Sequence, residues 1–263
     1  MQERSHAFAM KSQIWLLDPR PNLPSITEAV RHGFELSEAS NTPVMLQVRI
    51  RCCHVHGAFV AKDNVPPPLT VREALSNPQR DTNRIVLPPA SFLHEKEKVE
   101  KRWPAALDYI RENGLNEHFG PDTGRIGIVM QGGMYNGVIR ALQRLGLADV
   151  HGESEVPLYV LNVTYPIVED EFLDFCEGKD AVLVVEEGQP DYLEQAFRAV
   201  LHKAGKSQTL AGKDVFPMAG EYTGKVMLDS VSAFLRENAP ELLPAHSRAP
   251  NRPDEPQQVP DLS

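Results

Sequence analysis

The sequence predicts an α/β protein built on a parallel sheet, and three observations support this prediction. Short apolar runs of strand length alternate with amphipathic segments of helical length in the second half of the chain, which is typical of right-handed βαβ units. The run AVLVV at 181–185 is mostly β-branched, as expected for a strand buried on both faces. Glycines follow two of the predicted helices, at Gly146 and Gly178, where they suit a helix C-cap.

The composition is ordinary for a globular protein and excludes two classes of partner. The chain has 263 residues, of which 41% are hydrophobic and 24% charged, enough for one or two cores. A net charge of −9 and a pI near 5.5 argue against a nucleic-acid binder, which would carry a basic face. No apolar run approaches the roughly 20 residues needed to cross a bilayer, and the first residues lack the apolar core of a secretory signal.

The cysteines favour a reducing compartment, the cytoplasm. There are three of them, Cys52, Cys53 and Cys176, and no C-x-x-C pair occurs. An odd count with two adjacent members does not indicate a disulfide framework. The spacing supports neither an iron–sulfur cluster nor a zinc site, so no metal site is predicted. Cys52 and Cys53 are interpreted as small buried residues and not as nucleophiles.

Residues 1–60 are predicted to form one unit with a strand, a helix and a second strand. An apolar run at 14–17 precedes a helix that starts at Ser25, where Glu28 completes a capping box. A strand follows at 44–50. The predicted inward stripe of the helix consists of Ile26, Ala29, Val30, Gly33, Phe34 and Leu36.

Residues 61–124 are interpreted as a linker that contains a charged helix. Proline clusters fill the stretch 61–89, as is typical of connections between domains. A helix follows at 92–113, and Pro104 marks a kink or a second start. The proline-rich stretch 240–263 is predicted to be a disordered tail.

Residues 125–239 are predicted to form the main α/β domain. Its strands and helices alternate along the sequence. The predicted strands are 126–130, 158–163 and 181–185, the predicted helices are 135–145, 168–177, 192–204 and 223–238, and extended pieces are expected at 208–216.

Two carboxylates stand where the third strand of this domain meets a helix. Glu186, Glu187 and Gly188 follow the strand directly, and ligands gather at this edge of open α/β sheets. The alternative is a polar turn whose carboxylates accept hydrogen bonds from helix N–H groups. We expect one carboxylate to hold the turn and the other to face a partner chain or domain.

Two further groups of polar residues are candidates. Arg49, Arg51 and His54 end the strand 44–50 and could bind a carboxylate or phosphate of a substrate or cofactor. The alternative, a polar strand end that faces another domain, has equal weight. Tyr135 and Asn136 open a helix after a glycine turn that is not G-x-G-x-x-G, so a close-packing turn or interface is favoured over an anion site.

The chain resembles a known family over most of its length. The stretches that carry the resemblance are EAVRHGFELSEASNTPVMLQVRIRCCH (28–54), VPLYVLNVTYPIVEDEFLDFCEGKDAVLVVEEGQPDYLEQAF (156–197) and LAGKDVFPMAGEYT (210–223). They resemble the α subunit of indolepyruvate ferredoxin oxidoreductase, a thiamine diphosphate-dependent 2-oxoacid oxidoreductase. The resemblance implies that residues 1–60 are the end of a pyrimidine-binding domain. It also implies that 125–239 is a transketolase C-terminal-like domain that supports assembly.

The departures from the family leave the catalytic residues unassigned. The glutamate that activates the aminopyrimidine, the G-D-G…N motif that binds Mg²⁺ and the cysteines of the 4Fe-4S clusters have no counterpart in this sequence. The chain is therefore expected to be inactive alone and to need the remaining domains or subunits as partners.

The resemblance implies a reaction for the whole enzyme. It would decarboxylate an aryl 2-oxoacid oxidatively to its acyl-CoA, with CoA as co-substrate and ferredoxin as electron acceptor. Two alternatives stay open. One is a non-catalytic α/β interaction module that docks a partner through its strand-end carboxylates, and the other is a component of a different transketolase-like enzyme.

Overall fold

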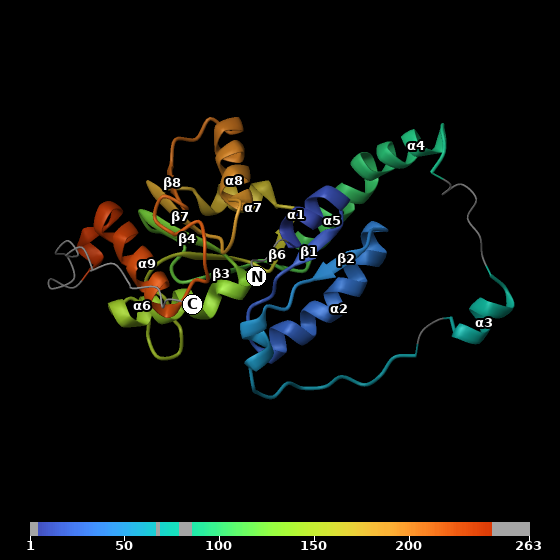
Figure 1. Cartoon of the computed structure of the whole chain (residues 1–263), viewed down its shortest axis with the longest axis horizontal. Helices are drawn as coiled ribbons and strands as arrows, with labels where there is room; N and C mark the ends of the chain where they lie inside the picture. Colours follow the sequence, from blue (N-terminus) through green and yellow to red (C-terminus); the bar gives the residue numbers. More distant parts are fainter. Residues whose placement is uncertain (1–4, 67–68, 79–85, 244–263) are drawn as a thin grey trace, which may run out of the picture.

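A computed structural model describes residues 5–66, 69–78 and 86–243 (Figure 1), so most of the predicted tail lies outside the described residues. The chain forms a five-stranded sheet in the order β3-β5-β4-β7-β8 and a three-stranded sheet in the order β2-β1-β6. The α/β prediction is confirmed. The strands are β1 (Trp15–Leu17), β2 (Val44–Leu46), β3 (Glu117–Phe119), β4 (Ile126–Gln131), β5 (Leu158–Leu161), β6 (Val163–Tyr165), β7 (Ala181–Val185) and β8 (Thr209–Ala211).

Helices cover both sheets. The α-helices are α1 (Ser5–Ser12), α2 (Leu23–Ser40), α3 (Val71–Ser76), α4 (Ala90–Glu97), α5 (Trp103–Glu112), α6 (Tyr135–Leu145), α7 (Glu169–Phe175), α8 (Tyr192–Lys203) and α9 (Gly224–Asn238). Short 3₁₀ segments are η1 (Ile50–His54), η4 (Gly132–Met134) and η5 (Pro240–Leu242), and a π-helical turn, η3 (Lys98–Arg102), joins α4 to α5.

The five-stranded sheet is the centre of the second module, residues 116–243. β4 pairs in parallel with β5 and β7, and β7 pairs in parallel with β8. Alternate residues of β7 enter two separate cores: Leu183 packs with α6 and α9, whereas Val184 packs with α7 and α8. The sheet is thus buried on both faces between two pairs of helices, and all five residues of β7 are buried.

The three-stranded sheet belongs to the first module, formed by residues 5–54 and 98–115 together with β6. β1 pairs in parallel with β2 and antiparallel with β6. Trp15, Leu36 and Ile110 are fully buried in the core that β1, α2 and α5 enclose, and Val163 of β6 lies in the same core. Because β6 follows β5 directly, this strand joins the two modules.

The predicted single strand at 158–163 was wrong, because the chain breaks at Asn162 between β5 and β6. The Asn162 carbonyl accepts a hydrogen bond from the Asp18 N–H, at 2.8 Å. Its side-chain oxygen accepts one from the Arg20 N–H, at 3.0 Å. Asn162 therefore redirects the strand from one sheet to the other.

The start and the inward face of α2 also differ from the prediction. The helix begins at Leu23, and Asn22 is its cap, with a side chain that accepts a hydrogen bond from the Ser25 N–H at 2.8 Å. Val30 and Phe34 were placed in the inward stripe, but they are 44% and 74% exposed. Ala29 and Leu36, seven residues apart, define the buried face, and at 3.6 residues per turn Val30 and Phe34 point well away from it.

Three further segments depart from the sequence prediction. α1 was not predicted. The strand expected at 44–50 ends at Leu46 and gives way to η1. The segment interpreted as a linker contains α3, where Thr70 and Glu73 form a reciprocal capping box. The second start at Pro104 is confirmed, because Pro104 lies in the first turn of α5.

The five-stranded sheet begins upstream of Arg125, the predicted start of the second domain. β3 pairs antiparallel with β5, with Phe119 opposite Leu158. Residues 117–119, which the sequence assigned to the linker, are therefore an edge strand of the sheet.

We predict that residues 115–243 fold alone with a higher thermal midpoint than residues 125–243. The shorter fragment lacks β3, so one edge of β5 loses its ladder hydrogen bonds and is left unpaired. Both midpoints can be measured by circular dichroism. Equal midpoints would show that β3 contributes nothing to the sheet.

Candidate functional site

The candidate site lies at the carboxyl ends of β4 and β7, which are neighbours in the sheet. β4 leads to α6 on one face, whereas β7 leads to α8 on the other. Two adjacent strands whose connections leave on opposite faces form a topological switch point, where open α/β sheets have a crevice for ligands.

The first module of the same chain fills this crevice. A side chain at Gly133 would collide with the guanidinium of Arg49, and one at Gly132 would collide with the backbone oxygen of Asp18. These glycines therefore allow the first module to approach β4 closely. The place where a ligand would be expected is taken by the chain's own arginine.

Arg49 is buried, at 7% exposure, and binds carboxylates from both modules. Its Nη2 donates to Oδ2 of Asp18 at 2.6 Å, and its Nη1 donates to Oε2 of Glu187 at 2.9 Å. A guanidinium fork suits two carboxylates at once. Arg49 thus connects the first module to the end of β7.

Glu187 is the centre of this contact. Besides Arg49, its carboxylate accepts hydrogen bonds from Nη2 of Arg51 at 2.6 Å and from the backbone N–H of Tyr222 at 2.8 Å. Its own N–H donates to Oε1 of Gln131 at 3.0 Å. Arg51 also pairs with the exposed Glu221, at 3.0 Å. We call these residues, with Asp18, the inter-module clamp.

Glu186 holds the turn between β7 and α8, which is the local role expected for one of these two carboxylates. Its Oε2 accepts hydrogen bonds from the N–H groups of Leu193 at 2.9 Å and Glu194 at 3.3 Å, at the start of α8. The side chain is 3% exposed. Burial raises the pKa of Glu186 to about 7, against the hydrogen bonds and the positive charge of Lys213, which favour the ionised form.

Lys213, which was not predicted from the sequence, completes the turn after β7. Its Nζ donates to the carbonyl oxygens of Glu186 at 2.5 Å and Gly188 at 2.6 Å, and to the hydroxyl of Tyr222 at 2.7 Å. Burial lowers the pKa of Lys213 and raises that of Tyr222. Gly188 has φ +94, a left-handed conformation that favours glycine. Lys213 therefore fixes the backbone that presents Glu187.

The remaining candidate residues, Tyr135, Asn136 and His54, differ in whether they contact the first module. The Tyr135 ring lies 5.0 Å from the Arg20 guanidinium carbon, and the Asn136 side chain donates to the Pro21 carbonyl at 3.3 Å. Both therefore contact the first module. His54 is exposed at the end of η1 and takes no part in the hydrogen bonds of the clamp.

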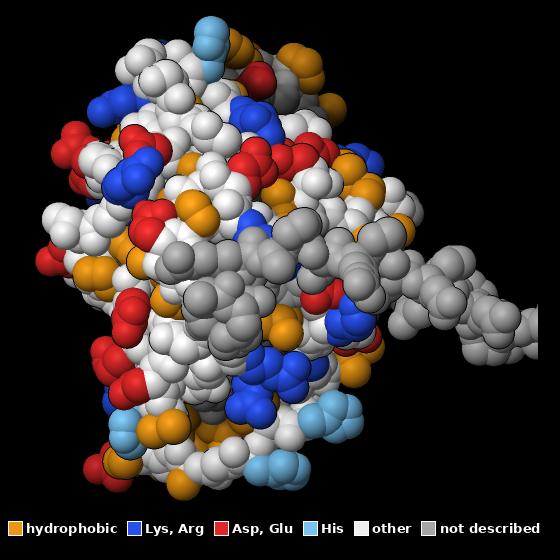
Figure 2. All heavy atoms as spheres, turned by 90° about the vertical axis from the view of Figure 1, so that its left-hand side faces the viewer, with side chains coloured by type: hydrophobic (Ala, Val, Ile, Leu, Met, Phe, Trp, Pro, Cys, Tyr) orange, Lys and Arg blue, Asp and Glu red, His pale blue; other side chains and the backbone are white. Residues whose placement is uncertain are grey.

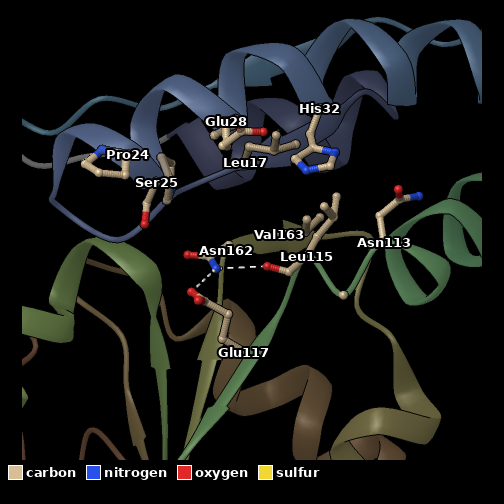
Figure 3. Close-up of a pocket in the computed structure, with 13 residues that line it drawn as sticks. Leu17, Pro24, Ser25, Glu28, His32, Asn113, Leu115, Glu117, Asn162 and Val163 are labelled. Carbon is tan, nitrogen blue, oxygen red and sulfur yellow. Dashed lines mark hydrogen bonds between the residues drawn. The ribbon is translucent and has the colours of Figure 1, made fainter. Parts of the chain in front are cut away.

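A cavity of about 280 Å³ lies beside the clamp, between α2 and the segment that precedes β3 (Figure 3). Its floor is apolar, with Leu17, Leu115 and Val163. At its edge the Asn162 side chain donates to the carboxylate of Glu117 at 2.7 Å and to the Leu115 carbonyl at 2.8 Å. None of the residues predicted from the sequence as site candidates lines this cavity.

The sequence pattern also did not predict Asp18, Glu117 or Asn162 as site residues. Asp18 had a usable signal, because it is a polar residue directly after the apolar run 14–17, in the same position relative to its strand as Glu186. Asn162 had a weaker one, because it interrupts the run LYVLNV.

The residues present do not fit the cofactors that the resemblance implies. Within the described residues, no group of three or more His, Cys, Asp or Glu side chains is arranged to hold a metal ion. The sequence has three cysteines, and a 4Fe-4S cluster takes four thiolates. Arg49 and Arg51 are already engaged by carboxylates of this chain. The arrangement can hold two modules together, and it offers no diphosphate or Mg²⁺ site of its own.

We predict that Glu186→Gln removes a pH dependence of stability. The raised pKa means that folded Glu186 keeps its proton up to about pH 7, whereas the unfolded residue loses it near 4.5. The contribution of protonated Glu186 to the free energy of unfolding is complete below pH 4.5 and is lost as the pH rises through 7. The free energy of unfolding of the wild type should therefore fall relative to the variant by up to about 3 kcal/mol between pH 4.5 and 8.

Glutamine matches the protonated side chain, so the two proteins should be similar near pH 5 and differ at pH 8. Urea unfolding at both values measures this. A constant difference across the range would show that Glu186 has an ordinary pKa, despite the burial among Lys213, Asp191 and the start of α8.

We predict that Glu187→Gln destabilises the chain itself by about 1–3 kcal/mol, because a carboxylate that is only 14% exposed and accepts several charge-assisted hydrogen bonds is lost. Glu221→Gln is the matched control. Glu221 also binds Arg51, but its side chain is 71% exposed, so the change should be within about 0.5 kcal/mol. Denaturant midpoints compare the two. Equal effects would contradict the central position of Glu187.

Comparisons with known proteins agree with the resemblance seen in the sequence. Residues 116–238 match the model of the indolepyruvate oxidoreductase domain. The indolepyruvate oxidoreductase subunit IorA of Methanothermobacter marburgensis is 29% identical over 99% of this chain and 39% of its own length. The IorA subunit of Pyrococcus abyssi is 25% identical over 91% of this chain and 36% of its own length.

A solved structure of 2-oxoglutarate:ferredoxin oxidoreductase from Magnetococcus marinus is similar with a TM-score of 0.49 and 15% identity, over 83% of this chain and 42% of that one. No helix within 5–66, 69–78 and 86–243 is long and apolar enough to cross a membrane. The chain spans about two fifths of the length of its IorA relatives. The predicted resemblance is confirmed as a similarity: the chain is similar along nearly its whole length to the α subunit of indolepyruvate ferredoxin oxidoreductase, and residues 116–238 match the indolepyruvate oxidoreductase domain.

Proposed function

We propose that the chain is a structural part of a thiamine diphosphate-dependent 2-oxoacid:ferredoxin oxidoreductase that acts on indolepyruvate or another aryl pyruvate in the cytoplasm. The observation that carries the proposal is the alignment with IorA subunits along nearly the whole chain. The enzyme would decarboxylate its substrate oxidatively to an acyl-CoA and pass electrons through 4Fe-4S clusters to ferredoxin. The thiamine diphosphate, with Mg²⁺, would supply the electron sink.

The role proposed for this chain is to hold modules in place and not to carry out the chemistry. The clamp supports this role, because Arg49 and Glu187 fill the crevice that a ligand would need. The catalytic residues and the cofactor ligands would come from the remaining domains or subunits. Residues 1–60 would be the end of the pyrimidine-binding domain, and the second module would support the assembly of the enzyme.

The rigid placement of the first module is the contribution that this chain makes to turnover. In a multi-domain enzyme a small displacement of a neighbouring domain is enough to slow the reaction, because reacting groups must meet in near-attack geometry. The clamp fixes that placement through buried charges, whose geometry is more restrictive than that of apolar contacts.

We predict that the chain alone neither binds thiamine diphosphate nor turns over, and that it does both when its partners are supplied. Titration calorimetry of the chain with Mg²⁺ and thiamine diphosphate should give no saturable heat. A micromolar dissociation constant, about −8 kcal/mol, would contradict the prediction.

The complementary experiment supplies the missing parts. The chain is co-expressed with a polypeptide that carries the parts of the Methanothermobacter marburgensis subunit that the chain does not match. Indolepyruvate-dependent reduction of ferredoxin should appear only in the combined sample. Glu187→Gln should lower that activity more than Glu221→Gln does. Activity that is indifferent to the presence of this chain would overturn the proposal.

A further inference from the structure

The two helix pairs that cover the five-stranded sheet have different surroundings. Figure 2 shows the face of the second module formed by α6 and α9, where acidic and basic side chains are mixed and apolar ones are scattered. The other pair, α7 and α8, borders a pocket that it shares with α1 and α5 of the first module. The volume of the pocket is about 630 Å³, within the range of roughly 300–1,000 Å³ that is usual for ligand sites. We call it the aromatic pocket, after four rings that line it: His6, Trp103, Tyr165 and Tyr192.

The four rings come from α1, the start of α5, the end of β6 and the start of α8. The rings of Trp103 and Tyr165 are perpendicular, with centres 5.5 Å apart. Those of His6 and Tyr192 are nearly parallel, at 11°, with centres 5.4 Å apart. Edge-on and offset contacts of this kind are the ones that aromatic rings prefer. Because the rings of Trp103, Tyr165 and Tyr192 are only partly buried, they keep surface that another aromatic ring can cover.

His6 brings a polar atom without a partner to this pocket. The residue is 8% exposed, and its Nδ1 is buried and has no hydrogen-bond partner among the described residues. Buried polar groups in folded proteins are almost always hydrogen-bonded, because leaving one unmatched is unfavourable. Burial lowers the pKa of His6 to about 4, so the imidazole is neutral at pH 7. A nitrogen of neutral imidazole either donates or accepts, and a hydroxyl group suits both cases.

The charged side chains that line the pocket are already matched by opposite charges. Nε of Arg111 lies 2.8 Å from Oδ2 of Asp170, and Nη2 donates to Oδ1 of the same carboxylate at 2.8 Å. Oε1 of Glu169 lies 3.6 Å from Nζ of Lys203. A charged ligand would therefore lose its hydration without gaining a counter-charge, so the pocket favours a neutral one.

We propose that the aromatic pocket binds a neutral, planar, bicyclic aromatic molecule with one hydroxyl group, which forms a hydrogen bond with Nδ1 of His6 while its rings pack against the other three rings. The volume admits such a ligand, since an apolar cavity of about 150 Å³ is enough for one benzene. The proposal concerns a site that is separate from the inter-module clamp, and it does not rest on the proposed role in an oxidoreductase.

The test uses three matched fluorinated ligands and the whole purified chain, with binding followed by fluorine NMR. 6-Fluoro-2-naphthol should bind with a dissociation constant below about 1 mM. 2-Fluoronaphthalene, which lacks the hydroxyl group, should bind about 10-fold more weakly, because it cannot satisfy Nδ1 of His6. 6-Fluoro-2-naphthoate, which is negatively charged, should bind at least about 10-fold more weakly than the naphthol.

His6→Phe tests the hydrogen bond, because it keeps a ring that can stack on Tyr192 and removes Nδ1. The variant should bind the naphthol about 10-fold more weakly than the wild type and 2-fluoronaphthalene equally well. His118→Phe is the matched control. His118 also stacks on a tyrosine, Tyr159, with centres 4.7 Å apart at 11°, but it does not line the aromatic pocket. Its change should leave the binding of both ligands as it is.

Ala196→Trp locates the binding, because Ala196 lines the pocket and a large side chain there would fill it. This variant should bind none of the ligands, whereas Ala199→Trp, at an exposed position of the same helix, should bind like the wild type. Circular dichroism checks that each variant is folded. A naphthol that shows no saturable binding up to about 1 mM would overturn the proposal. So would equal affinities of the wild type for the naphthol and 2-fluoronaphthalene, or binding that persists in Ala196→Trp.

Discussion

The contact between Arg49 and the two carboxylates Asp18 and Glu187 determines how the halves of this molecule fit together. A guanidinium that is almost fully buried has to be matched by nearby negative charge, because an unpaired buried charge is strongly unfavourable. Asp18 follows β1, Arg49 precedes η1 and Glu187 follows β7, so three strand or turn ends must meet at one point. The two glycines after β4 provide the space for that meeting.

Around this contact the polar groups have separate roles. Glu186 and Lys213 keep the turn after β7 in one shape, through the first N–H groups of α8 and through the carbonyl oxygens of the turn itself. Glu187 then presents its carboxylate to the first module from a fixed backbone. Adjacent acidic residues in a sequence thus serve two different purposes, one local and one across modules, because successive positions after a strand point in different directions.

The parts of the fold that the sequence predicted well are those whose pattern of buried and exposed residues is visible within the segment itself: a fully buried strand and a strongly amphipathic helix. β7 was predicted at 181–185 and α6 at 135–145, with the same ends as in the structure. The inward face of α2 was predicted correctly at Ala29 and Leu36 and wrongly at Val30 and Phe34, because an apolar side chain on a helix does not indicate which neighbour covers it. The strand-end position identified Arg49 and Glu187 as candidates, but their pairing depends on a contact between residues far apart in the sequence. Lys213 had no local signal at all, since its role arises only where β8 and the turn after β7 come together.

The three-stranded sheet has a consequence for the order in which the chain folds. β1 and β2 precede the other strands in the sequence, but β6, the second partner of β1, lies beyond β3, β4 and β5. During synthesis the first module therefore stays incomplete until the ribosome has produced much of the second module. Until then one edge of β1 is unpaired and part of the core of the first module is exposed. Closing such a long-range pairing is slow because its loop entropy must be overcome before the contact forms. The unpaired edge of β1 is then a place where non-native strand pairing can occur while the rest of the chain emerges.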